Sequence, residues 1–392
     1  MGKGKIPLAT KFRIGVEEIK ITNTYKYLGT IINSNGSFTH AKKDLKQKGM
    51  KALFSIWKSI SPGNRPPVNL ACKLFDTMVK PIILYNSDVW GSEFPSTIQN
   101  LIQNGEAVPD DKYLKFINDC PFEKLHLKFC KMLLGVKKNA SNIACRAELG
   151  RYPLIIEIYI SIIKYWMRLI SLPKNRVVVD ALNMNMKMQE AGQYSWTSLV
   201  KFILQSAGLN EIWVKKEFNN PRQILHTLRQ NLHNRYNEVF LRSIHNDSRE
   251  NEKQSNKLRT YRTVKVNHVK ERYLTEIKNP EIRAAVSKLR LSSHGLMIEK
   301  GRHLRLDIKD RICKNCNSKD VEDEFHVVML CSKYEAERKT LFGTFEEEIH
   351  NWHSLSSKEK FLLIFKMESN LIETGKFFLH ILSNINNQIV CL

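Results

Sequence analysis

The chain has 392 residues, with 62 Lys and Arg against 39 Asp and Glu, which gives a formal net charge of +23 at pH 7. This length provides for two or more compact units, and a hydrophobic content of 42% argues against wholesale disorder. The positive excess favours a polyanionic partner, either nucleic acid or an acidic membrane surface; a merely well-solvated basic protein is the alternative.

The most apolar stretch, PLIIEIYISIIKYWMRLI (153–170), carries Glu157, Lys164 and Arg168. A lone membrane-spanning helix would not readily tolerate these charges, so a buried amphipathic helix is predicted. The amino terminus lacks the apolar core of a signal peptide. The eight cysteines include one close pair, which favours metal binding in a reducing compartment over disulfides. We expect a protein of the nucleus or cytoplasm that is not secreted.

Strands and turns are predicted for the first forty residues. FRIGVEEIKI (12–21) alternates in polarity, and YKYLGTIINSNGSF (25–38) is an apolar run ended by Asn35-Gly36, which indicates a hairpin.

Helical periodicity follows. Apolar residues from Leu45 to Ile60 recur at three- and four-residue steps, and prolines after position 61 end that helix. A second helix over 68–90 should be kinked or divided at Pro81. Residues 91–120 are predicted to be an irregular loop or inserted arm. Further helices should extend to about residue 245, followed by a solvated linker over 245–257.

The helix after residue 120 carries a basic stripe formed by Lys124, Lys128 and Lys131 at i, i+4 and i+7. The overall prediction is a mainly α protein with a short N-terminal β-hairpin.

A metal site is predicted near the C-terminus. Cys313 and Cys316 are separated by two residues, His326 follows ten residues later, and Cys331 comes five residues after that. Three thiolates and an imidazole form a closed tetrahedral set, which favours structural over catalytic zinc. Unpaired buried thiols with a surface histidine are the alternative.

The helix that carries His326 should end or distort near Cys331, because residues five apart on an ideal helix lie roughly 140° apart around its axis. Asp323 is expected near the start of that helix.

Basic residues upstream of the cysteines are phosphate-binding in type. The candidate contacts in this tract are Lys288, Arg290, Arg302, Arg305 and Arg311. Four aromatic residues could stack on unpaired RNA bases, although ordinary packing is the favoured interpretation. These are Tyr261, Tyr273, Phe325 and Tyr334.

Several segments occur in an order that resembles a known family. They are YKYLGTIINSNGSF, LFDTMVKPIILYNSDVWG, HLKFCKMLLGVKKNASNIACRAELGRYPL, SKLRLSSHGLMIEKGRH and CKNC followed by EDEFHVVMLCSKY. Together they resemble the C-terminal half of reverse transcriptases from LINE-type, non-LTR retrotransposons, over about Tyr25 to Tyr334.

The resemblance implies roles for particular residues. Tyr27, Leu28 and Gly29 match a primer-grip hairpin. The helix 41–60 matches a thumb that follows a template–primer backbone, with Lys42, Lys43, Lys46 and Lys51 as contacts. Cys313, Cys316, His326 and Cys331 match the terminal zinc knuckle, which is linked in this family to nucleic-acid binding.

The implied division has six parts. The parts are a primer-grip-like β segment (1–40), thumb-like helices (41–95), a helical connector (96–245), a basic linker with helices (246–312), a zinc knuckle (313–334) and a helical tail (335–392).

Polymerase chemistry in this family uses carboxylates that hold two Mg²⁺ ions. They lie upstream of the primer grip, and only about two dozen residues precede it here. Asp110-Asp111 follows a proline and lacks flanking apolar strands, so it is not expected to replace them. No catalytic residue is assigned.

The leading hypothesis is a nucleic-acid-binding fragment that holds structural Zn²⁺ and binds RNA and DNA, with neither a membrane nor a small-molecule substrate as partner. One alternative is part of an active RNA-directed DNA polymerase and endonuclease, with Mg²⁺ bound in a longer product. Another is a domesticated zinc-binding interaction protein.

Overall fold

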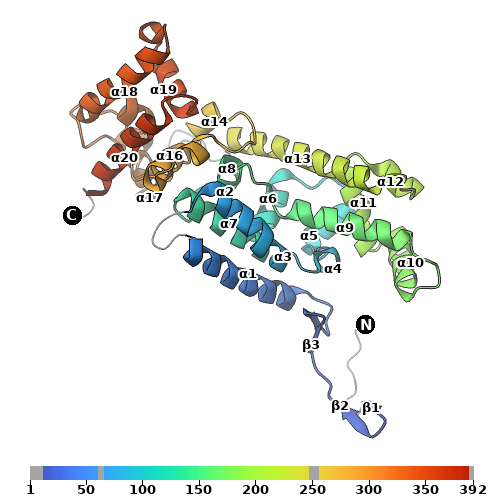
Figure 1. Ribbon diagram of the computed structural model, residues 1–392. Helices are drawn as coiled ribbons and strands as arrows, with labels where there is room; N and C mark the ends of the chain where they lie inside the picture. The colour runs from blue at the N-terminus through green and yellow to red at the C-terminus, as the bar shows by residue number, and fades with distance from the viewer. Residues whose placement is uncertain (1–11, 61–65, 247–255, 388–392) are drawn as a thin grey trace. The chain divides into compact units, whose positions relative to one another are not determined.

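The computed structural model describes residues 12–60, 66–246 and 256–387, and these are mainly helical, as the sequence predicts (Figure 1). The chain divides into two compact units. The first unit comprises Met1–Ser55, Phe75–Leu125 and Pro153–His233, and the second comprises Ile56–Leu74, His126–Tyr152 and Asn234–Leu392. Most of the predicted linker lies outside the described residues.

The strands form two separate antiparallel hairpins. The strands are β1 (Phe12–Ile14), β2 (Glu17–Ile19), β3 (Thr24–Tyr27) and β4 (Thr30–Asn33). Tyr25 faces Ile32 in the second hairpin. Its two-residue turn is Leu28-Gly29, with φ of 43° and 84°. The prediction of a hairpin turn at Asn35-Gly36 is therefore wrong.

Asn35-Gly36 instead leads from β4 into the first helix. The Asn33 and Asn35 side chains accept hydrogen bonds from the Asn35 and Ser37 amides at 3.1 and 2.9 Å. These short polar side chains accept hydrogen bonds from the backbone amides of a connecting loop. This explains why turn-forming residues occur there without a hairpin.

Helix α1 (Thr39–Ile60) buries Ala41, Leu45, Gly49 and Leu53, so its predicted apolar face is confirmed. The predicted division at Pro81 is also confirmed. Helix α2 (Val68–Leu74) passes through a π-helical turn (Phe75–Val79) into α3 (Lys80–Ile83), which has that proline in its first turn. Helix α4 (Ser87–Trp90) follows Asn86, whose φ of 54° is left-handed.

Residues 91–120 are not an irregular arm, and this prediction is wrong. They contain α5 (Ser96–Gln103) and α6 (Asp110–Asp119), each preceded by a proline. Buried Ile98, Ile102 and Ile117 give these short helices an apolar face among polar neighbours.

The remaining helices of the first unit begin with α9. They are α9 (Ile155–Ile170), α10 (Val177–Glu190), α11 (Trp196–Ser206), α12 (Asn210–Lys215) and α13 (Pro221–His245), the last of which continues into the second unit. Helix α9 buries ten of its residues and packs on α4, α10 and α11, as its sequence predicts. Among the described residues, no helix is long and apolar enough to cross a membrane.

The second unit contains the end of α1, all of α2, part of α7 (Pro121–Leu134) and the end of α13, and it finishes with a helical tail. Its other helices are α8 (Asn142–Glu148), α14 (Tyr261–Val264), α15 (Tyr273–Glu276), α16 (Pro280–Arg290), α17 (Met297–His303), α18 (Glu335–Glu348), α19 (Ser357–Lys366) and α20 (Leu371–Asn387). Helix α20 packs on α16 and α18 within this unit (Figure 1). A Cβ on Gly375 would lie 2.4 Å from Ile282, so the approach of α20 to α16 requires glycine there.

Candidate metal centre

Cys313, Cys316, His326 and Cys331 lie together in the second unit, with one potential ligand atom of each within 4.8 Å of the others. The Cys313 and Cys331 sulfurs are 4.0 Å apart, and the Cys316 sulfur lies 3.3 Å from His326 Nε2. Tetrahedral zinc with Zn–S near 2.3 Å places its ligand atoms roughly 3.4–3.8 Å apart. The arrangement therefore fits a single ion without a large movement of the chain.

The first two cysteines are held by a loop closed on itself. The Cys313 amide donates to the Asp320 carbonyl at 2.8 Å, and Ile312 pairs with Val321 in an isolated bridge. The Asn315 amide points at the Cys313 sulfur, 3.4 Å away. An N–H directed at sulfur stabilises a thiolate, which is the form that binds metal.

The second pair of ligands spans a π-helical turn, His326–Leu330. The Cys331 amide donates to the His326 carbonyl at 2.8 Å, five residues back. The turn widens the helix and the chain then becomes extended at Cys331, so the predicted distortion is confirmed. Asp323 caps the segment by accepting the His326 amide at 2.8 Å, also as predicted.

The thiols differ in acidity. Burial opposes ionisation of Cys316, but hydrogen bonds with Ser318, Cys313 and His326 together outweigh it and lower the pKa of this thiol to about 6. Burial raises the pKa of the Cys313 and Cys331 thiols. Because a metal ion replaces the proton on each sulfur, binding of zinc would release protons.

Further side chains fix the ligands, and spacing alone did not reveal them. Arg338 donates to the Cys331 carbonyl at 3.0 Å, and buried Glu322 accepts from the Asn315 side chain at 2.8 Å. Asp320 lies 3.6 Å from His326 Nδ1. A carboxylate next to the second ring nitrogen is the usual means of orienting a ligating histidine. No disulfide joins the seven described cysteines.

Two of the predicted phosphate-binding residues lie in the interior. Arg290 is paired with Glu148 at 2.6 Å and Glu271 at 3.1 Å, and Arg311 donates to the Ile298 carbonyl at 3.0 Å. Both side chains are enclosed, so their guanidinium groups serve the fold. Lys288 and Arg302 are half-buried, and Arg305 is exposed.

The predicted lysines differ in their exposure and in their partners. Lys42 pairs with Glu93 at 2.7 Å, whereas Lys43 and Lys51 are exposed and Lys46 is half-buried on the same helix. On α7, Lys124 and Lys128 are exposed, and Lys124 pairs with Asp119 at 3.3 Å. Lys131 donates to Asn142 at 2.6 Å, and burial lowers the pKa of its ammonium.

The Tyr27-Leu28-Gly29 turn presents Tyr27 and Leu28 to solvent, 57% and 71% exposed. Its backbone is held by Tyr85, whose hydroxyl donates to the Leu28 carbonyl at 2.8 Å. Asn86 donates to Thr30 at 2.6 Å. This turn is thus fixed by the segment between α3 and α4, which sequence periodicity does not indicate.

Tyr261, Tyr273 and Tyr334 are fully buried, and Phe325 packs against Phe361 with ring centroids 5.3 Å apart. The favoured interpretation, ordinary packing, is confirmed for the three tyrosines.

Asp110 and Asp111 form the first turn of α6, where carboxylates complement the helix dipole. Among the described residues, the Cys/His cluster is the group found with metal-binding geometry.

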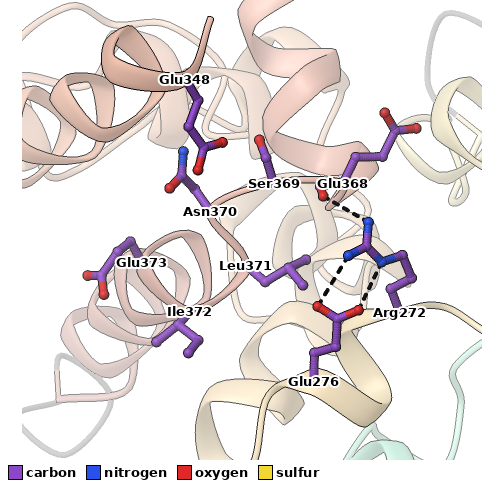
Figure 2. Close-up of a pocket in the computed structure, with 9 residues that line it drawn as sticks. All are labelled: Arg272, Glu276, Glu348, Glu368, Ser369, Asn370, Leu371, Ile372 and Glu373. Carbon is purple, nitrogen blue, oxygen red and sulfur yellow. Dashed lines mark hydrogen bonds and ion pairs between the residues drawn. The ribbon is translucent and has the colours of Figure 1, made fainter.

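The second unit also contains an acidic hollow of about 480 Å³. Figure 2 shows Arg272 at its side, donating to Glu276 at 2.9 Å and to the Glu368 carbonyl at 3.1 Å. Glu348, Glu368 and Glu373 complete the acidic lining. Carboxylates repel phosphates, so this part of the second unit is unsuited to a nucleic-acid backbone.

Compared with protein-family models, with curated proteins and with solved structures, the chain finds no match.

Proposed function

We propose that this chain binds RNA and DNA as the thumb, connector and zinc-knuckle part of a LINE-type reverse transcriptase, with a structural Zn²⁺ held by Cys313, Cys316, His326 and Cys331. The ordered sequence motifs support the family assignment. The closed Cys₃His cluster, which has the geometry of a structural site, supports the metal.

The observation that favours nucleic acid is the set of cations around this cluster. Lys314, Lys319 and Lys333 stand beside three of the ligands, and all three are exposed. Among the described residues, none of the three side-chain ammonium groups has a hydrogen bond or an ion pair. Lysines without an internal partner can neutralise phosphates and release counterions, which is the main source of affinity in non-specific binding.

The test of binding is fluorescence anisotropy of a labelled single-stranded RNA and a matched DNA with the full chain, over a series of salt concentrations. We expect log K to fall linearly with log salt concentration. Replacing the three lysines with alanine should lower the slope by about 2, since each single-strand phosphate contact contributes about 0.7.

The control replaces Lys215, Lys339 and Lys376, which are already paired with Glu211, Glu335 and Glu373. This control matches the loss of charge but not the position. If both triple variants lose the same amount of the salt slope, the effect comes from net charge and not from the position of the lysines. Salt-insensitive or absent binding would contradict the proposed function.

The metal is tested by elemental analysis. The full chain should contain one zinc per molecule, and Cys313→Ser should lower that content because it removes a thiolate. Cys72→Ser is the control, since Cys72 lies outside the cluster. Unchanged zinc in Cys313→Ser would contradict the metal assignment.

A further inference from the structure

The first unit contains a small hollow of about 130 Å³ among α5, α10 and α11. Four glutamines (Gln103, Gln189, Gln193 and Gln205) line it together with Lys201 and Phe202. Ligand sites for drug-sized molecules usually measure about 300–1,000 Å³, so this hollow suits one ring system.

The polar groups of the hollow are available. Within the part of the chain that the structure describes, no hydrogen bond or ion pair engages the side chains of these four glutamines or the Lys201 ammonium. Each glutamine amide offers two donors and one acceptor oxygen, and lysine offers donors only. A planar ligand with both donors and acceptors on its edge therefore matches this lining.

The walls of the hollow are held by the ends of its helices. Helices α5 and α10 each end at a left-handed glycine, Gly105 with φ 72° and Gly192 with φ 72°. The amides that follow reach back to the Leu101 and Met188 carbonyls at 2.9 and 2.8 Å, which closes both helix ends.

Helix α11 is fixed at its start as well. The Ser195 amide donates to Ser198 Oγ at 3.0 Å, within the first turn. Such caps keep the glutamines at fixed backbone positions, so little backbone entropy would be lost when a ligand binds.

We propose that this hollow accepts one unpaired nucleobase of a bound single strand. The inference rests on the proposed function and adds a site to it. Glutamine amides pair with base edges, lysine donates to purine acceptors, and Phe202 supplies an aromatic face for stacking. A nucleobase is planar, carries donors and acceptors, and needs no countercharge.

The first arm of the test uses free ribonucleosides, which carry no phosphate. Adenosine, guanosine, cytidine and uridine are each added to the full chain, and saturation-transfer NMR measures binding. We expect transfer to at least one nucleoside. Its affinity should fall about tenfold in Gln193→Ala/Gln205→Ala, the loss of about two net hydrogen bonds.

Both glutamines are exposed, so the double variant should fold, which circular dichroism checks. The matched control is Gln223→Ala. This glutamine is also exposed, but it does not line the hollow.

The second arm uses a labelled single-stranded RNA and the same strand with abasic positions. The intact strand should bind more tightly, and the double variant should lose this advantage while keeping the salt slope. If no nucleoside binds, or if the double variant behaves like the wild type while RNA still binds, the hollow is not a base site and the proposed function stands. If no strand binds at all, both proposals fail.

Discussion

Arg290 shows how strongly one residue can be committed to the fold. Its guanidinium is enclosed in the second unit, with Glu148 at 2.6 Å and Glu271 at 3.1 Å. Tyr273 donates to Glu148 at 2.8 Å. Such a buried pair stabilises little relative to an apolar replacement, but removing one partner is costly because the other charge stays buried.

Glu148→Gln should therefore destabilise the second unit. We expect the free energy of unfolding to fall by about 3 kcal/mol, since Glu271 compensates Arg290 only in part. Urea unfolding followed by circular dichroism measures this. The control is Glu335→Gln, which breaks an exposed pair with Lys339 and should change stability little. A similar loss of unfolding free energy in both variants would mean that the buried pair contributes no more to stability than the exposed pair.

The Glu148 carboxyl should also make the free energy of unfolding depend on pH. Burial opposes ionisation of Glu148, but the charges of Arg290 and Lys265 and the hydrogen bonds from Arg290 and Tyr273 together hold the pKa of this carboxyl below its ordinary value of 4.5. A lowered folded pKa means that the stabilisation is complete above the unfolded pKa and is lost as the pH falls through the folded one.

The stability difference between the wild type and Glu148→Gln should thus be constant from pH 7 to about 5.5 and shrink below pH 4.5. Urea titrations at a series of pH values measure it. A difference that grows on acidification would reverse the sign of the argument.

The four candidate metal ligands could be predicted from sequence, because their spacing depends only on a local loop and one turn of helix. The role of Arg290 could not. Its neighbours in the chain mark it as part of a basic tract, and only the fold brings Glu148, 142 residues away, against it.

At the scale of elements, close approach of helices depends on small residues. Gly49 lies in the middle of α1, and a Cβ there would lie 2.2 Å from Ile83 and 3.0 Å from Leu125. All three residues belong to the first unit. The α1 helix therefore packs here through its backbone.

Gly49→Ala should destabilise the first unit by about 1–3 kcal/mol, because overpacking exceeds the gain of about 1 kcal/mol in helix propensity. Gly343→Ala is the matched control, since a Cβ there meets nothing within 4 Å. It should stabilise its helix by up to about 1 kcal/mol. Thermal unfolding of both variants checks the opposite signs, and a stabilised Gly49→Ala would show that α1 can shift.

Long periodic helices such as α1 and α9 could be predicted because their apolar faces repeat over several turns. Helices α5 and α6 could not, because each offers only two or three turns among polar residues. The Leu28-Gly29 turn also gave no standard signal. A leucine at positive φ is disfavoured on its own, and the Tyr85 hydroxyl holds it from 57 residues away.

For the whole molecule, the two units do not follow the chain in order. Helices α1, α7 and α13 each continue from one unit into the other. Periodicity reports only which face of a helix is apolar, so it places no boundary inside a continuous helix. The six consecutive segments proposed from the resemblance remain a prediction about function.

The zinc proposed for the Cys/His cluster should stabilise the second unit and leave the first unaffected. The π turn that carries His326 packs on α18 and α19, and Phe325 next to it contacts Phe361 of α19. Arg338 of α18 donates to the Cys331 carbonyl at 3.0 Å. Loss of the proposed zinc would leave three thiols and an imidazole without the ion that joins the loop of Cys313 and Cys316 to the π turn of His326.

Metal removal with a chelator should therefore lower the protection of backbone amides in α18, α19 and residues 313–331, while α9 of the first unit keeps its slow exchange. A bound ligand stabilises only the state that binds it, so the effect should follow the unit that contains the Cys/His cluster. Hydrogen exchange with mass spectrometry measures both regions in one sample, and added zinc should restore protection. Equal losses in α9 would show that the two units unfold together, and unchanged exchange everywhere would show that the cluster folds without metal.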